Sequence, residues 1–142
     1  MSRKIRTIKL RKHVDIINER GAGEAITPGM LLEFTAADTY IKGTATATQC
    51  PKIVALEDEL QGRTIDDDYA VGDPVQAWNC VPGEEANLAL KTGETIVIGD
   101  ALVSAGDGTV KKGVAGTDFV VGYAGEAITA SVAGEKIATV II

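Results

Sequence analysis

Residues 93–113 read GETIVIGDALVSAGDGTVKKG and show most clearly how the chain folds. Short runs rich in Val, Ile and Ala, at 94–98 and 101–104, alternate with glycine-containing turns at 99–100 and 106–108. Glycine tolerates a positive φ, and an aspartate side chain accepts hydrogen bonds from the backbone of its own turn. The stretch therefore predicts short strands joined by tight turns.

The same alternation continues outward in both directions, with a turn signal about every 8–12 residues. Residues 27–34 (TPGMLLEF) begin with a Pro-Gly turn and continue as an apolar strand. Residues 52–56 (KIVAL) are predicted to be a buried strand, and 57–62 a single helical turn that ends at glycine. Residues 73–78 (DPVQAW) carry apolar side chains on both faces, which predicts a strand between the core and an interface.

Four further segments complete the interpretation. Residues 119–123 (FVVGY) are predicted to be a strand, and 136–142 (KIATVII) either a central strand or an oligomer contact, because this run is apolar and β-branched. Residues 36–48 suit a surface hairpin with Gly43 near its turn, and 82–87 (PGEEAN) an exposed loop. The chain is predicted to be mostly β, a compact, small, antiparallel, barrel-like domain with little helix.

The chain has 142 residues, the length of one domain, and its charges are unevenly distributed along the sequence. Residues 1–20 contain seven basic and two acidic residues, a balance of +5. Residues 21–142 contain seven basic and eighteen acidic residues, a balance of −11, so that the whole chain has a net charge of −6. This division into a basic arm and an acidic body bears on which partners the chain binds, and it says little about the fold.

Composition excludes several classes of function. Aromatic residues make up only 4% of the chain and there is a single His, which excludes a multi-histidine metal site and a stacking platform for single-stranded nucleic acid. No segment approaches the roughly 20 apolar residues that span a bilayer. The basic N-terminus is not followed by the apolar core of a signal peptide. We therefore expect no membrane partner.

The residues that could carry chemistry are few. His13 lies among cations with nothing obvious to orient it, and Ser104 lacks the first glycine of a G-x-S-x-G elbow. The run 66–68 (DDD) does not match a calcium loop and is interpreted as a solvated loop. Cys50 and Cys80 are interpreted as buried free thiols, although the sequence leaves a single bridge open. We expect no enzyme activity, no metal and no cofactor.

Five phrases together resemble a known family. EAITPGMLLEF, VALEDELQG, DDDYAVGDPVQ, GETIVIGDALVSAGDGTVKKG and VVGYAGEAI occur in this order. They resemble the small capsid decoration (cement) proteins of tailed bacteriophages, which are similar to the lambda-type head decoration protein. The resemblance covers about residues 14–142. It implies a β-tulip fold and a homotrimer on the exterior of the expanded capsid, at threefold and quasi-threefold positions. There the protein would bind the major capsid protein and stabilise the shell, after passing through the host cytoplasm during assembly.

The resemblance also implies a capsid-binding N-terminal arm at 1–20, extending from a decoration domain at 21–142. The candidate contacts combine cations with apolar anchors: Arg3, Lys4, Ile5, Arg6, Ile8, Lys9, Leu10, Arg11 and Lys12. The alternation from Ile8 to Leu10 suits an extended strand that adds to a sheet edge of a capsid subunit. Exposed ion pairs contribute only about 0–1 kcal/mol each, so apolar and main-chain contacts and the avidity of three arms are needed.

Other interpretations of the arm and body remain open at this point. The arm could be a disordered basic tail that serves solubility, or it could bind nucleic acid without sequence specificity. The balance of −11 on the body and the lack of a helix-turn-helix, zinc knuckle or aromatic array disfavour nucleic acid. A small enzyme or carbohydrate-binding module is a third alternative, since β folds host both.

Overall fold

The computed structural model describes residues 7–12, 16–46 and 50–142. These residues form thirteen strands and one short 3-10 helix, η1 (Glu59–Gln61). The strands are β1 (Lys9–Arg11), β2 (Ile17–Ala22), β3 (Leu31–Phe34), β4 (Thr39–Lys42), β5 (Ile53–Ala55), β6 (Pro74–Asn79), β7 (Glu85–Ala89), β8 (Thr95–Ile96), β9 (Ala101–Ser104), β10 (Val110–Lys112), β11 (Val120–Ala124), β12 (Ile128–Thr129) and β13 (Lys136–Ile141). The predicted fold class, mostly β and barrel-like with little helix, is confirmed.

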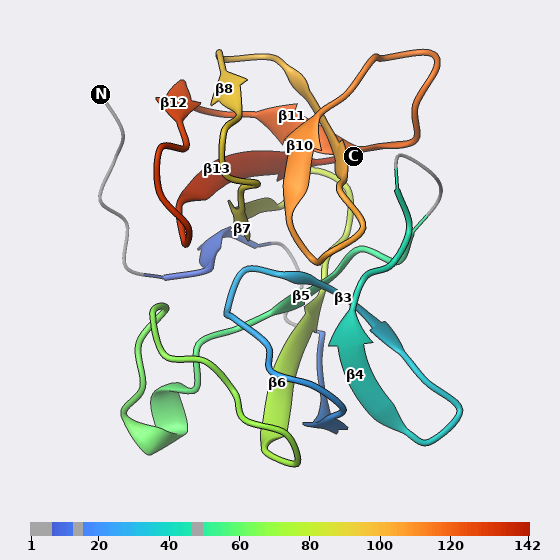
Figure 1. Cartoon of the computed structure of the whole chain (residues 1–142), viewed down its shortest axis with the longest axis vertical. Helices are drawn as coiled ribbons and strands as arrows, with labels where there is room; N and C mark the ends of the chain where they lie inside the picture. The colour runs from blue at the N-terminus through green and yellow to red at the C-terminus, as the bar shows by residue number, and fades with distance from the viewer. Residues whose placement is uncertain (1–6, 13–15, 47–49) are drawn as a thin grey trace.

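A closed barrel forms the lower half of the molecule (Figure 1). Its strands follow the order β2-β4-β3-β5-β6, and β6 closes the barrel by pairing with both β2 and β5. Every pair of neighbours is antiparallel except β2 and β4, which run parallel. The interior is filled by Ala22, Ile26, Leu32, Tyr40, Ile53, Ala55, Tyr69, Val75 and Ala77.

A six-stranded antiparallel sheet and the small β12-β8 ribbon form the upper half (Figure 1). The order is β1-β7-β13-β11-β9-β10, so β13 is a central strand, as one of the two alternatives for residues 136–142 predicted. A second core lies between this sheet and the barrel and takes side chains from both. Among its members are Ile8, Val54 and Trp78 from the first 79 residues and Leu88 and Ile137 from the sheet.

The predicted turn chemistry is confirmed in detail. Asp73 and Asp100 each accept, through a carboxylate oxygen, the backbone N–H of the residue three positions earlier, at 2.9 and 3.0 Å. The preceding Gly72 and Gly99 both have φ of +90°, in the region that disfavours residues with a Cβ. The predicted helical turn is also confirmed, because η1 ends at Gly62 with φ of +72°.

Three local predictions are wrong. The outward face of β6 does not meet an interface, since Trp78 is fully buried in the second core. The hairpin turn falls at residues 35–38, where Asp38 has φ of +61°, and not near Gly43. The predicted loop at 82–87 becomes strand β7 from Glu85 onward, paired with the central strand β13.

The predicted boundary at residue 20 does not describe the packing either. Ile8 has no exposed surface, β1 pairs with β7, and β2 is a barrel strand. Residues 7–12 and 16–20 therefore belong to the folded body and do not form an extended arm. The main division of the chain follows β6, because the barrel strands end at Asn79 and all later strands lie in the upper half.

Candidate functional site

The described part of the basic segment is fastened to the body by one buried carboxylate. Glu57, in the segment between β5 and η1, accepts the backbone N–H of Ile8 at 2.9 Å and the hydroxyl of Thr7 at 3.1 Å. Burial raises the pKa of Glu57 above its ordinary value of 4.5, despite these two hydrogen bonds. The bond to Ile8 satisfies a main-chain donor that would otherwise be buried without a partner.

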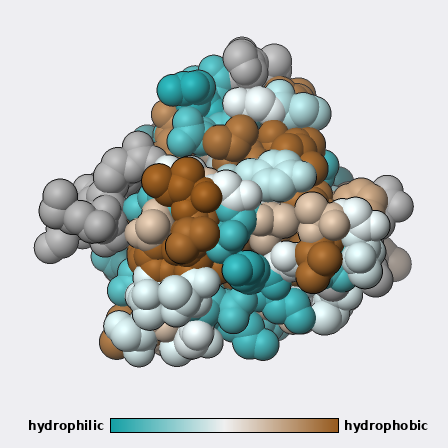
Figure 2. Space-filling view, turned by 90° about the horizontal axis from the view of Figure 1, so that it is seen from above, coloured by the Kyte–Doolittle hydropathy of each residue, from teal (hydrophilic) through white to brown (hydrophobic). Residues whose placement is uncertain are grey.

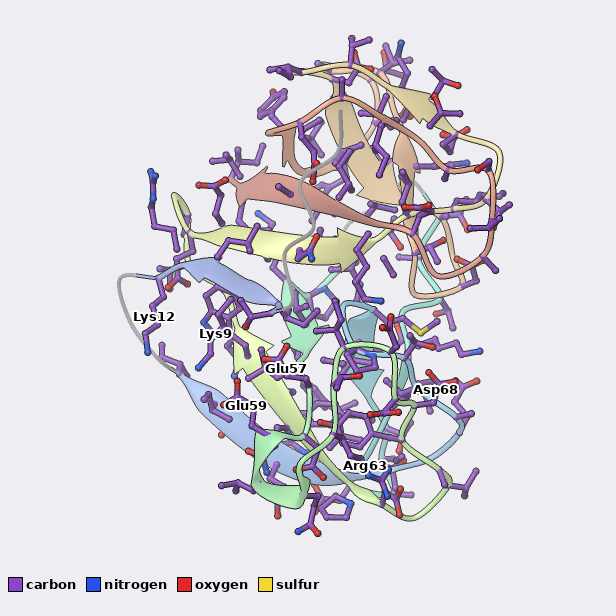
Figure 3. The ribbon with its side chains drawn as sticks, turned by 90° about the vertical axis from the view of Figure 1, so that its left-hand side faces the viewer. Lys9, Lys12, Glu57, Glu59, Arg63 and Asp68 are labelled. Atoms are coloured by element: carbon purple, nitrogen blue, oxygen red, sulfur yellow. The ribbon has the colours of Figure 1, made fainter. Side chains whose placement is uncertain are left out.

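Acidic groups of the body lie beside the cations that follow Ile8. Arg11 stands opposite Glu85 in the register of β1 and β7, with 3.7 Å between guanidinium and carboxylate. Lys9 lines a cavity of about 200 Å³, whose other lining residues are Ile17, Leu56, Glu57, Asp58, Glu59, Leu60 and Gln76. Figure 3 shows Lys9 and Lys12 on the same side of the molecule as Glu57 and Glu59, and neither lysine is without a partner.

The structure thus separates the predicted arm residues into three groups. Arg3, Lys4, Ile5 and Arg6 lie outside the described residues. Ile8 points into the core and is not available as an apolar anchor for a capsid, which corrects that prediction. Lys9 and Leu10 are half-buried in β1, and Arg11 and Lys12 are the exposed members among the arm residues that the structure describes. Counting charges along the sequence could not show that residues 7–12 pack against the body, because the acids that face them are about 50–75 positions away in sequence.

A larger cavity, of about 370 Å³, opens near the ends of β7 and β13. Its lining residues are Thr27, Met30, Ala89, Leu90, Lys91, Thr92, Asp107, Thr109, Ala133, Gly134, Glu135 and Lys136. Burial lowers the pKa of Lys136, while Asp66, Asp68 and Glu135 act in the opposite direction. The lining contains no Ser, Cys or His, and cations and carboxylates are mixed within it.

The residues considered for chemistry are placed as follows. Ser104 is fully buried at the end of β9, and its hydroxyl makes no hydrogen bond. Cys50 and Cys80 are free, and burial raises the pKa of the Cys80 thiol to about 12. His13 lies outside the described residues. Within the part of the chain that the structure describes, no group of His, Cys, Asp or Glu could hold a metal ion, and no helix could cross a membrane.

An apolar surface that the sequence did not place lies on the outward side of β11 and β13. It consists of Phe119, Tyr123, Val140 and Ile142, each 37–40% exposed, and we call it the β11–β13 face. Tyr123 and Val140 stand opposite each other across the strand pair. The Nζ atom of Lys52 lies 6.0 Å from the centre of the Phe119 ring and also contacts the carbonyl oxygen of Ile142. The signal for this face in the sequence was the largely apolar run 136–142, which contains Lys136 and Thr139.

The barrel carries a second exposed aromatic group. Phe34, at the end of β3, is 58% exposed, and the guanidinium of Arg20 lies 5.0 Å from the centre of its ring. The guanidinium of Arg20 also donates hydrogen bonds to the carboxylate of Asp38 at 2.9 Å and to the hydroxyl of Tyr40 at 3.0 Å. These contacts restrain one aromatic and one cationic side chain, a pair of types enriched at protein interfaces.

Exposed apolar side chains also occur at the end of the molecule that carries β8 and β12. Figure 2 views this end and shows apolar patches separated by hydrophilic side chains. Val97 and Ile98 follow β8, and Val114 lies in the loop after β10. All three are more than half exposed. The described surface therefore offers several small apolar contacts and no deep polar cleft dominates it.

One solved structure gives a comparison over nearly the whole chain. No protein-family model and no curated protein matches the sequence. The fold is similar to that of the head fiber gp8.5 N base of bacteriophage phi29, with a TM-score of 0.62 and 21% sequence identity. The match covers 91% of this chain and 95% of the phage chain. The chain thus shares the fold of a protein associated with a phage head.

Proposed function

We propose that this chain is a structural protein of a bacteriophage head, which binds the outer surface of the expanded capsid and stabilises the shell. The observation that carries the proposal is the similarity in fold to the phi29 head fiber base across 91% of the chain. The ordered series of decoration-protein phrases in the sequence supports the same role independently. In this proposal the protein is a homotrimer at threefold and quasi-threefold positions, its partner is the major capsid protein, and it is located on the virion exterior.

The mode of attachment follows from the placement of the basic segment. Ile8 and Glu57 fasten the segment to the body, so the segment cannot extend from residue 20. Arg11 and Lys12 remain exposed, and Arg3, Lys4 and Arg6 precede the fastened residue in sequence. We place the shell contact on these cations, which would meet acidic groups of the capsid. The apolar contribution must then come from the body.

The test is addition of the purified chain to expanded, undecorated shells of the phage that encodes it. We expect the chain to co-sediment with the shells and to raise their resistance to heat and denaturant. A folded chain that binds no such shell, in low and in physiological salt, contradicts the proposed function. Added salt should weaken the binding, because part of the contact is between exposed charges.

A charge variant separates the role of the cations from that of the fold. Removing residues 1–12 would also remove Ile8 from the core, so we replace Arg3, Lys4 and Arg6 together by Ser. Three exposed ion pairs at up to about 1 kcal/mol each amount to about 3 kcal/mol at most, so binding should weaken by up to about a hundredfold. The matched control replaces Lys42, Lys91 and Lys111 by Ser and should bind as the wild type does. Equal binding by both triple variants would show that the basic segment does not contact the shell.

A further inference from the structure

The cavity of about 370 Å³ near the ends of β7 and β13 lies between chain segments that main-chain hydrogen bonds hold together. The N–H of Ala89 donates to the carbonyl oxygen of Gly29 at 2.9 Å, which joins β7 to the turn before β3. The N–H of Leu90 donates to the carbonyl oxygen of Glu135 at 2.9 Å, which joins the end of β7 to the turn before β13. The walls are thus formed before any ligand arrives, as they are in most small-molecule sites.

Several polar side chains of the lining are free to bind a ligand. Within the described part of the chain, the side chains of Lys91, Thr92 and Glu135 make no hydrogen bond and no salt bridge. The Nζ atom of Lys136 reaches a carbonyl oxygen of its own turn only at 3.5 Å, which is longer than an ordinary hydrogen bond. The stem of Lys136 lies against Gly29, where an added Cβ would come within 3.2 Å of its Cε atom. Gly29 therefore leaves room for this lysine in the wall.

Charge is already compensated on each side of the cavity. Burial acts to raise the pKa of Asp107, but hydrogen bonds from Thr109 and the charge of Lys91 lower it below its ordinary value. Burial lowers the pKa of Lys136, and the carboxylate of Glu135, its neighbour in the lining, opposes that change. Each lysine thus has a carboxylate near it, and the cavity has no separate positive and negative ends.

This mixture of charges decides which ligands suit the cavity. A carboxylate or phosphate would meet two acids in the lining and a body whose net charge is −11. An amine would meet two lysines. An apolar molecule would leave the free polar groups without partners, which is costly. A zwitterion such as an amino acid needs a positive and a negative end, and the cavity does not provide them.

A hydroxyl group suits such a lining because it donates one hydrogen bond and accepts up to two. It can donate to Glu135 and accept from Lys136 at the same time, and hydrogen bonds to charged groups are the stronger kind. A sugar ring carries several hydroxyls on a partly apolar body, which Met30 and Leu90 in the wall can contact. We propose that this cavity binds a short, neutral saccharide, an activity additional to the proposed binding of the shell.

The test follows a methyl group in the wall of the cavity. The chain has two methionines, Met1 and Met30, so labelling of methionine methyl groups with ¹³C gives a simple spectrum in which Met30→Leu assigns the Met30 signal. The probes are neutral disaccharides of glucose, galactose, mannose and N-acetylglucosamine. At least one should shift the Met30 signal in a saturable way below about 20 mM, with a dissociation constant of about 1 mM.

Two variants of the full chain remove a charge and preserve the shape of the side chain. Lys136→Met keeps an unbranched stem, and Glu135→Gln keeps an oxygen that accepts hydrogen bonds. Because burial disfavours the charged form of Lys136, its loss should not impair folding, which far-UV circular dichroism checks. Each variant should raise the dissociation constant of the saccharide by about tenfold or more. The matched controls, Lys42→Met and Glu59→Gln, lie outside the lining and should bind as the wild type does.

Three outcomes would overturn the inference. They are a Met30 signal that no disaccharide shifts, equal binding by the cavity variants and their controls, and a shift caused by phosphate, glutamate or spermidine but by no saccharide. The addition of Lys136→Met to shells is measured separately and should equal that of the wild type. A chain that binds shells and no saccharide would leave the proposed function standing, whereas a chain that binds a saccharide and no shell would contradict only the proposed function.

Discussion

Glu57 shows how a single residue converts a basic tail into part of the fold. Its carboxylate is almost fully buried, and burial of a charge is costly unless hydrogen bonds compensate. Here one oxygen accepts the N–H of Ile8 and the other accepts the hydroxyl of Thr7. The same contacts that satisfy the carboxylate hold the N-terminal segment against η1 and β7.

Glu57→Gln should change how stability depends on pH. The folded pKa of Glu57 lies above the unfolded value, so the folded state binds the proton more tightly. This group therefore adds stability below the unfolded pKa, and that contribution is lost as pH rises through the folded pKa. Urea unfolding between pH 7 and pH 4 should show the wild type gaining stability on acidification relative to Glu57→Gln. Parallel pH profiles for the two proteins would contradict this assignment.

The two cysteines should be unreactive while the chain is folded. Burial raises the pKa of both thiols, to about 12 for Cys80, so very little thiolate exists at pH 8. Iodoacetamide at pH 8, followed by mass spectrometry, should add no label to the folded chain within the time that labels both thiols in urea. Rapid labelling of the folded protein would show that these sites open frequently.

At the scale of elements, the turns carry the most regular information in the chain. Gly99 has φ of +90°, and a Cβ added there would meet no atom within 4 Å, so Gly99→Ala introduces backbone strain without a clash. We expect a loss of about 1–2 kcal/mol in the free energy of unfolding. Gly43→Ala is the matched control, because Gly43 lies outside the positive-φ region and a Cβ there makes an ordinary contact with Leu31. Equal losses for the two variants would show that conformation is not the cause.

Ile8→Ala should detach β1 from the sheet. Ile8 is fully buried in the second core, and truncation of a buried Ile costs about 2–5 kcal/mol. Because β1 has only β7 as a neighbour, its amides should then exchange with solvent faster than those of β13. Hydrogen exchange read by mass spectrometry on residues 9–11 checks this. Unchanged exchange at β1 would mean that pairing with β7 is sufficient to hold it.

The sequence predicted those elements whose signals are local. The Gly-Asp turns, the helical turn that ends at Gly62 and the strand at 52–56 depend on neighbouring residues, and all three occur. The loop predicted at 82–87 fails because its polar residues are satisfied in the folded state. Glu84 is buried and accepts the N–H of Val81 at 2.7 Å, and Asn87 faces the central strand. Polar composition alone cannot distinguish such a strand from a loop.

At the scale of the whole molecule, the sequence also failed to predict how the basic segment packs, because its contacts are with residues distant in sequence. Charge and alternation predicted an extended arm around Ile8, but an edge strand protected by cations has the same sequence pattern. Which of the two occurs depends on acids at distant positions, such as Glu57 and Glu85. The run 136–142, predicted to be either a central strand or an oligomer contact, forms the central strand β13, and the sequence did not show which of its residues point outward.

The two halves of the molecule should unfold together, because β6 contributes to both cores. Its Val75 and Ala77 fill the barrel, whereas Trp78 packs with residues of the six-stranded sheet. Leu32→Ala in the barrel and Ile137→Ala in the sheet should therefore each lower the free energy of unfolding by about 2–5 kcal/mol, and each variant should still unfold in a single transition.

Unfolding is best followed by two signals. Trp78 is the only tryptophan, so its fluorescence reports on the boundary between the halves, while far-UV circular dichroism reports on all strands. Coincident curves are the mark of a two-state transition. If Leu32→Ala shifted one signal and left the other in place, the barrel and the sheet would be separate folding units. The second core takes side chains from both halves, which makes coincidence of the two curves the expected result.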